Sequence, residues 1–145
     1  PTLTQELPIE PTENINSHTV LVVDDEPLNL KIVGSQLLNQ NIKVINASTG
    51  LEALACVEFG KPDLVLLDIM MPEFSGMDVL DHMQNDPDLR GIPVIIVSAK
   101  SLPKDIQAGL DAGAVAYLTK PVTFQQLNEA VQTTLDEKLG LDNQA

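Results

Sequence analysis

The stretch VLVVDDEP, residues 20–27, places four apolar residues directly before three consecutive carboxylates, Asp24, Asp25 and Glu26. A short apolar run bounded by polar residues is typical of a buried strand. Pro27 follows the carboxylates, and proline is common at the first position of a helix. The stretch therefore predicts a buried strand that delivers adjacent like charges to its end, followed at once by a helix.

The composition narrows the class of protein. The 145 residues are 43% hydrophobic, enough for one domain with a buried core. Twenty-one acidic against 8 basic residues give a net charge of -13, which repels nucleic-acid phosphates and anionic lipid. The longest apolar runs fall far below the roughly 20 residues that span a bilayer. We expect a cytoplasmic domain that neither binds nucleic acid directly nor inserts into a membrane.

Residues 1–17 differ in composition from the rest of the chain. They contain three prolines, three glutamates and no basic residue, without apolar periodicity, which favours a flexible linker or tether. The chain also begins without methionine, so we expect a piece of a longer or processed protein. The predicted organisation is a tether over residues 1–17, one domain over residues 18–139 and a C-terminal tail over residues 140–145.

From Thr19 onward, apolar runs alternate with segments of helical period, as in repeated βα units. The expected strands are residues 19–23, 43–47, 63–68, 93–98 and 114–118. The expected helices are residues 27–39, 49–59, 76–85, 104–112 and 123–139. Such apolar strands need helices on both faces, and right-handed crossovers leave few arrangements. We predict an α/β fold with a doubly wound, five-stranded parallel sheet of order 2-1-3-4-5, a flavodoxin-like three-layer sandwich.

The last predicted helix is amphipathic. Phe124, Leu127, Val131 and Leu135 fall on one face of it. We expect this face to pack on the sheet and the polar remainder to meet water.

In the predicted strand order, the first and third strands flank the point where ligands bind beyond the strand ends. The third strand ends in Asp68, which should therefore lie beside Asp24 and Asp25. Three carboxylates this close oppose one another's ionisation unless a cation intervenes, and Mg²⁺ prefers oxygen ligands. The alternative is that Asp25 or Glu26 only caps the following helix.

Two later strands also end in polar residues. The fourth ends in Ser98, and Lys120 follows the fifth. Alone, Ser98 has the simpler interpretation of a satisfied strand-end hydroxyl, and Lys120 that of a solvated surface charge. Together with the carboxylates they form a constellation suited to phosphoryl transfer onto an aspartate, which needs positioning and charge neutralisation.

The motifs DDEP (24–27), LLDIMMPEFSGMDVL (66–80), VIIVSAK (94–100) and AYLTKP (116–121) occur in this order. Together they resemble the receiver domain of two-component response regulators, over about residues 18–139. The resemblance implies that Asp68 accepts a phosphoryl group from the phosphohistidine of a sensor histidine kinase or phosphotransfer protein. It also implies that Mg²⁺ is held by Asp24, Asp25, Asp68 and the backbone carbonyl of Met70.

The same resemblance assigns the residues around the phosphoacceptor. Lys120 would contact the phosphoryl oxygens, Ser98 would take the switch hydroxyl position and Tyr117 the switch aromatic. A cis peptide bond is expected between Lys120 and Pro121. A covalently tethered or separate output domain is implied, but AVAYLTKPV (114–122) lacks the acidic residues and phenylalanine usual in winged-helix regulators, which disfavours a DNA-binding output.

Three other functions are compatible with parts of this pattern. A haloacid-dehalogenase-type phosphatase needs a second carboxylate two residues after the nucleophile, and position 70 is methionine. A flavodoxin-like FMN site would place a phosphate against the three carboxylates, which would repel it. A phosphorylation-independent docking receiver, or pseudo-receiver, remains open. Cys56, His18 and His82 are expected to have no chemical role.

Overall fold

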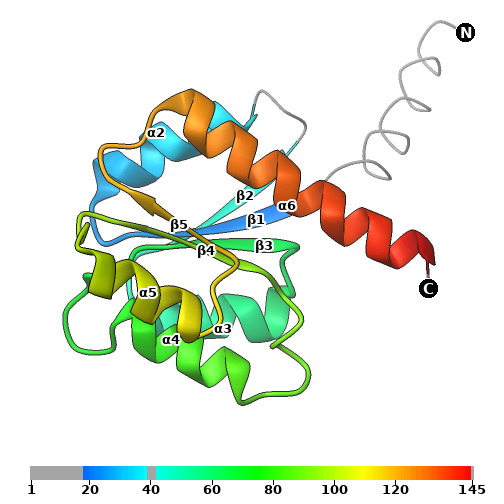
Figure 1. Cartoon of the computed structure of the whole chain (residues 1–145), viewed down its shortest axis with the longest axis horizontal. Coiled ribbons are helices and arrows are strands. Elements are labelled where there is room, and N and C mark those ends of the chain that lie inside the picture. Colours follow the sequence, from blue (N-terminus) through cyan, green and yellow to red (C-terminus); the bar gives the residue numbers. More distant parts are fainter. Residues whose placement is uncertain (1–17, 39–41, 145) are drawn as a thin grey trace, which may run out of the picture.

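Within residues 18–38 and 42–144, which the computed structural model describes, strands and helices alternate along the chain (Figure 1). The strands are β1 (His18–Val23), β2 (Ile42–Ala47), β3 (Leu64–Leu67), β4 (Val94–Ser98) and β5 (Ala116–Thr119). The helices are α2 (Pro27–Leu38), α3 (Gly50–Gly60), α4 (Gly76–Gln84), α5 (Pro103–Asp111) and α6 (Phe124–Gln144). Residues 1–17, predicted to be a tether, lie outside the described residues.

The five strands form one parallel sheet of order β2-β1-β3-β4-β5, which confirms the predicted fold. Figure 1 shows α2 and α6 on one face and α3, α4 and α5 on the other. Alternate residues of each strand face opposite layers. In β1, Leu21 and Val23 join the core under α3 and α4, while Val20 and Val22 join the core under α2 and α6. Burial on both faces explains why the strand is apolar throughout.

The structure changes two details of the predicted last helix. Leu127, Val131 and Leu135 are buried, but the Phe124 side chain is 48% exposed. Phe124 is the first residue of α6, and the buried face begins one turn later. The helix also runs to Gln144, past the predicted end at Leu139. A single glycine at position 140 costs about 1 kcal/mol in a helix, which is too little to stop it. Residues 140–144, which belong to the predicted C-terminal tail, are therefore helical.

None of the helices in the described part of the chain is long and apolar enough to cross a bilayer.

The start of α4 packs against the backbone at the end of β3 and so holds the loop between them. Ser75 Oγ accepts the Asp78 N–H (3.3 Å), and the Asp78 carboxylate accepts the Ser75 N–H (2.9 Å), a capping box. At Gly76, a Cβ atom would meet the carbonyl oxygen of Asp68 and would lie 2.6 Å from Ile69 Cα. Only a residue without a side chain permits this close approach, so Gly76 fixes the path of the loop beside Asp68.

We expect Gly76→Ala to lower the free energy of unfolding by about 1–3 kcal/mol, because the added methyl group meets backbone atoms that cannot rotate away. Urea denaturation measures the change. Gly34→Ala is the matched control, since a Cβ there meets only Val44 Cγ1 at 3.9 Å inside α2. That control should gain up to about 1 kcal/mol from helix propensity. Equal effects of the two substitutions would contradict the proposed packing.

Candidate functional site

Asp24 and Asp68 follow two neighbouring strands that end at the same level. β1 and β3 pair in register up to Val23 and Leu67, and the Asp68 N–H donates to the Val23 carbonyl at 3.0 Å. Both side chains are largely buried, with exposed fractions of 5% for Asp24 and 6% for Asp68. Parallel strands thus bring two carboxylates from distant parts of the sequence into one buried place.

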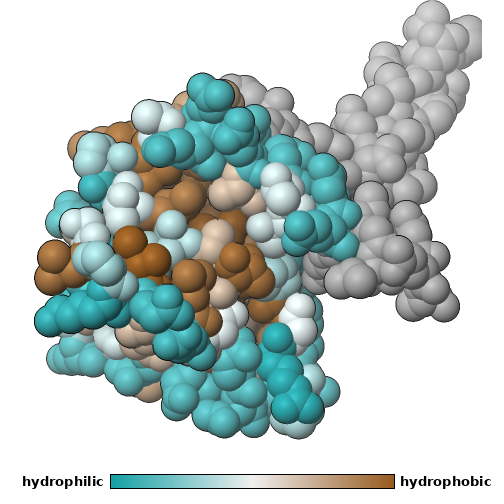
Figure 2. Space-filling model, viewed as in Figure 1, coloured by the Kyte–Doolittle hydropathy of each residue, from teal (hydrophilic) through white to brown (hydrophobic). Residues whose placement is uncertain are grey.

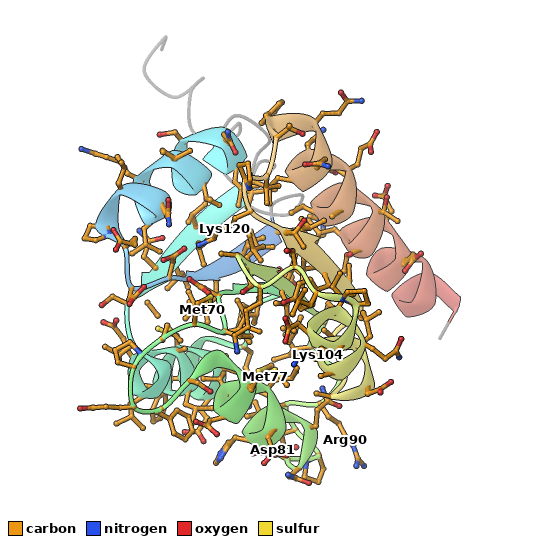
Figure 3. All side chains as sticks on the ribbon, turned by 60° about the vertical axis from the view of Figure 1, so that its left-hand side comes forward. Met70, Met77, Asp81, Arg90, Lys104 and Lys120 are labelled. Carbon is orange, nitrogen blue, oxygen red and sulfur yellow. The ribbon has the colours of Figure 1, made fainter. Side chains whose placement is uncertain are left out.

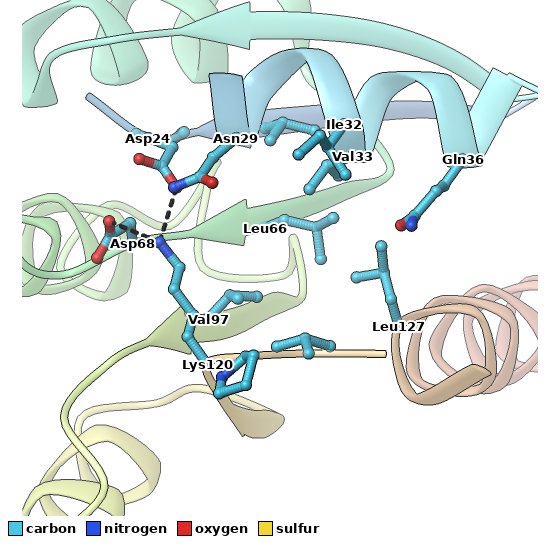
Figure 4. Close-up of a pocket in the computed structure, with 14 residues that line it drawn as sticks. Asp24, Asn29, Ile32, Val33, Gln36, Leu66, Asp68, Val97, Lys120 and Leu127 are labelled. Atoms are coloured by element: carbon cyan, nitrogen blue, oxygen red, sulfur yellow. Dashed lines mark hydrogen bonds and ion pairs between the residues drawn. The ribbon is translucent and has the colours of Figure 1, made fainter. Parts of the chain in front are cut away.

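Lys120 supplies the opposite charge. It follows β5, the strand at one edge of the sheet. Its Nζ lies 2.9 Å from Asp24 Oδ2 and 3.2 Å from Asp68 Oδ2 (Figure 4). Burial alone would lower the pKa of Lys120, but the hydrogen bonds and charges of the two carboxylates outweigh it and raise the pKa. The ammonium therefore stays protonated and bridges the two carboxylates.

Further hydrogen bonds orient the two buried carboxylates. Asp24 Oδ1 accepts the Glu26 N–H (2.9 Å), and Asp24 Oδ2 accepts the Asn29 side-chain amide (3.2 Å). Asp68 Oδ1 accepts the Met70 N–H (2.9 Å). The carboxylate that bonds backbone at the entry to α2 is thus Asp24, while Asp25 is exposed. Sequence reasoning did not find Asn29, whose only signal is its place in the first turn of α2.

The carboxylate cluster fits a hard cation. One oxygen each from Asp24, Asp25 and Asp68 lies within 4.8 Å of the other two. Among the described residues this is the one group of three or more acidic, histidine or cysteine side chains so arranged. Oxygen donors alone are the ligands that Mg²⁺ takes. Met70, the remaining predicted ligand through its carbonyl, lies in the loop directly after β3, at the same end of the molecule as Lys120 (Figure 3).

Ser98 and Tyr117 meet at the backbone of Lys100. Ser98 is fully buried at the end of β4, and its Oγ accepts the Lys100 N–H at 3.1 Å. The Tyr117 hydroxyl donates to the Lys100 carbonyl at 2.8 Å. Burial raises the pKa of Tyr117, the Ser98 hydroxyl lowers it in part, and the charges of Asp105 and Asp68 raise it further. Sequence reasoning paired Ser98 with Tyr117 but did not identify Lys100 as the residue between them.

A groove of about 500 Å³ opens beside the ion pair, between α2 and α6. Asp24, Asn29 and Lys120 form its polar end in Figure 4. The rest is mainly apolar, lined by Ile32, Val33, Leu66, Val97, Val122 and Leu127. The Asp68 carboxylate lies at the polar end, next to the Lys120 ammonium (Figure 4).

The remaining candidates lie away from this site. Cys56 is half-buried against the core. Its burial raises the pKa of the thiol, and the nearby Glu52 charge raises it further. His18 Nδ1 lies 3.9 Å from Asp63 Oδ2, and His82 Nε2 lies 3.6 Å from Glu58 Oε2. None of the three adjoins the carboxylate cluster.

The expected cis peptide bond between Lys120 and Pro121 is present. The family model described as "Response regulator receiver domain" matches residues 20–132. The chain belongs to the response regulator receiver domain family. Receiver domains serve mainly as signalling switches, and their phosphoacceptor role is general to the family.

Known receiver proteins match at the levels of sequence and structure. A probable cyclic di-GMP phosphodiesterase of Vibrio cholerae is 41% identical over 130 residues, 90% of this chain and 29% of that protein. The polar-differentiation response regulator DivK of Brucella anthropi is 34% identical over 82% of this chain and 97% of its own length. The signal receiver domain of a putative Luxo repressor protein from Vibrio parahaemolyticus superposes with a TM-score of 0.82, at 28% identity over 87% of this chain and 95% of that chain.

The receiver chain thus spans less than a third of the length of the Vibrio cholerae relative, and only the receiver part of that multidomain protein aligns.

We expect Lys120→Met to lower the free energy of unfolding in metal-free buffer by about 2 kcal/mol, less than the 3–5 of fully buried pairs because the ammonium is partly exposed. The Lys120 pKa lies above its usual 10.5. The contribution of the ammonium is therefore present below pH 10.5 and lost as pH rises through the folded-state pKa. Wild type and variant should converge in strong alkali.

Urea denaturation at neutral and at alkaline pH tests this ion pair. Lys104→Met, an exposed lysine in α5, is the control and should leave stability nearly unchanged. A Lys120→Met protein as stable as wild type at neutral pH would contradict the assigned ion pair.

Proposed function

We propose that Asp68 accepts a phosphoryl group from the phosphohistidine of a sensor histidine kinase or phosphotransfer protein. The observation behind this proposal is the placement of the Asp68 carboxylate, buried at the end of β3, 3.2 Å from the Lys120 ammonium and within 4.8 Å of the Asp24 and Asp25 oxygens. A nucleophilic carboxylate next to fixed charges is the arrangement that phosphoryl transfer requires.

In the transfer, an oxygen of Asp68 attacks phosphorus and forms an oxygen–phosphorus bond. The phosphorus–nitrogen bond to the donor imidazole breaks, and the imidazole leaves with the bonding electron pair. Lys120 neutralises charge on the phosphoryl oxygens, and its raised pKa keeps it protonated for this role. The Met70 N–H, which donates to Asp68 Oδ1 (2.9 Å), holds the nucleophile in place.

We infer that Asp24, Asp25, Asp68 and the Met70 carbonyl hold Mg²⁺. One ammonium opposes three carboxylates at this site, so further positive charge is needed before a phosphoryl group can approach. When bound, Mg²⁺ supplies that charge to the phosphoryl oxygens. Asp24 would orient it, because its two oxygens are already fixed by Glu26 and Asn29.

The groove between α2 and α6 is the proposed place where the phosphodonor protein docks. It opens beside Asp68 and is lined in part by Ile32 of α2, whose apolar side chain is exposed, and Leu28, one turn earlier in α2, is exposed as well. An apolar surface at the mouth of a site is typical of a protein-binding surface. We further propose a cytoplasmic receiver unit over residues 18–139, tethered by residues 1–17 or coupled otherwise to an output domain.

The phosphorylation is tested by intact mass after incubation with a small-molecule phosphodonor. We expect the gain of one phosphoryl group with Mg²⁺, none with chelator and none in Asp68→Asn. The control is Asp81→Asn, an exposed aspartate of α4 that lies at the bottom of Figure 3, away from Lys120. It should label like wild type. Equal labelling of Asp68→Asn and wild type would refute the assignment, and no labelling of either would favour a docking pseudo-receiver.

The proposed switch passes through Lys100. Ser98 and Tyr117 bond the N–H and the carbonyl of Lys100, respectively. If the Ser98 hydroxyl turns to a phosphoryl oxygen on Asp68, the Lys100 N–H loses its partner and the loop between β4 and α5 can shift. The Tyr117 hydroxyl bonds that same loop, so the shift changes the surface formed by α5, β5 and α6. Apolar side chains gather between α5 and α6 on the face seen in Figure 2.

We expect beryllium fluoride, a phosphoryl mimic, to shift NMR resonances of Tyr117 and of residues 103–111 in wild type. In Ser98→Ala the shifts should be much smaller, because alanine has no hydroxyl that could leave the Lys100 N–H and bond a phosphoryl oxygen instead. Moving the equilibrium between the two packings from 1:99 to 99:1 would need about 5.5 kcal/mol of differential interaction energy. One hydrogen bond supplies less, so a partial shift is expected. Thr119→Ala removes a hydroxyl at the end of the neighbouring strand β5 and is the control; its shifts should match those of wild type. Shifts of equal size in Ser98→Ala would exclude this coupling.

A further inference from the structure

Gly109, the buried residue of α5, faces the ring of Tyr117. A Cβ atom at this position would lie 2.9 Å from Tyr117 Cδ2, 3.1 Å from Tyr117 Cε2 and 2.7 Å from Ile96 Cδ1. Carbon atoms in van der Waals contact are about 3.5–4.0 Å apart. The ring therefore occupies space that exists only because residue 109 has no side chain.

We infer that Gly109 is the positioning residue for Tyr117: the missing side chain forms the seat that lets the ring lie against α5 while its hydroxyl reaches Lys100. This inference rests on the proposed switch and names the residue that sets the position of its aromatic group. The Tyr117 ring thereby contacts α5, and its hydroxyl contacts Lys100 in the loop between β4 and α5. One side chain thus bonds this loop and packs on the helix that follows it.

The two contacts of Tyr117 cannot both survive a methyl group at residue 109. The ring would have to retreat by roughly 0.5–1 Å to restore normal carbon contacts. The hydroxyl lies 2.8 Å from the Lys100 carbonyl, and a rigid ring transmits the same retreat to it. The hydrogen bond would then exceed its normal range of about 2.5–3.0 Å. Ile96 is different, since its Cδ1 is the end of a flexible chain and can rotate away.

Helix formation itself does not explain a glycine here. Glycine in a helix interior is about 1 kcal/mol less favourable than alanine. Gly34, in α2, has open space around its Cβ position, the nearest atom being Val44 Cγ1 at 3.9 Å. The two glycines therefore share a helical setting and differ in what an added methyl group would meet, which makes Gly34 the matched control.

The chain offers a specific probe of this seat. Tyr117 is the one tyrosine in the sequence, and there is no tryptophan. Intrinsic fluorescence excited in the tyrosine band therefore reports chiefly on this ring. The test is acrylamide quenching of wild type, Gly109→Ala, Gly34→Ala and the double variant Ile96→Val/Gly109→Ala. The double variant removes Ile96 Cδ1, so that the Tyr117 contact alone remains.

We expect the quenching constant to rise roughly twofold in Gly109→Ala and in the double variant, because a half-buried ring becomes exposed. Gly34→Ala should match wild type. Beryllium fluoride should change tyrosine fluorescence in wild type and Gly34→Ala but not in Gly109→Ala. Wild-type quenching and a wild-type response to beryllium fluoride in Gly109→Ala would overturn the inference.

Two further measurements separate the possible failures. Phosphodonor labelling of Asp68 in Gly109→Ala should stay near the wild-type level, since Gly109 does not adjoin the carboxylates. Absence of labelling in wild type would reject the proposed function, while the quenching comparison would still test the seat. If Gly109→Ala does not fold, Tyr117→Ala/Gly109→Ala should fold and melt above Tyr117→Ala. Failure of that double variant to fold would show that Tyr117 is not what Gly109 accommodates.

Discussion

The electrostatic balance at the ends of β1 and β3 is the constraint on which the rest of the structure depends. Two buried carboxylates face each other there, and the Lys120 ammonium lies within 2.9 and 3.2 Å of them. Burial of an unpaired charge is costly, whereas an ion pair with further hydrogen bonds is tolerated. The sheet must therefore hold three strand ends in register, since a shift of any strand would leave a charge buried without its partner.

The packing of the sheet provides that register. Strands apolar on both sides are clamped between two helical layers, so they cannot slide without exposing apolar side chains. Gly76 brings the start of α4 against the backbone of Asp68 and Ile69. The packed core thus ends at the carboxylate cluster, so the position of Asp68 is set by the sheet and by the start of α4.

The proposed output of the domain depends on weaker contacts. The Lys100 backbone is held by one hydrogen bond from its N–H to Ser98 and one from the Tyr117 hydroxyl to its carbonyl. Single hydrogen bonds contribute only about 0.5–1.5 kcal/mol each to stability. A site held by ion pairs and several hydrogen bonds next to a loop held by two is a suitable arrangement for the proposed switch, because the charge change stays local while the loop and α5 can respond.

The sequence by itself determined the sheet order and the positions of Asp24, Asp68, Ser98 and Lys120, since the topology places strand ends together whatever the side chains do. It did not determine the contacts between one helix or strand and the next. The Asn29 amide, the Lys100 backbone, the groove between α2 and α6 and the seat at Gly109 depend on the packing distance between a helix and the sheet. Periodicity records which face of a helix is buried, but not how closely that face approaches its neighbour, and only the tertiary structure decided this distance.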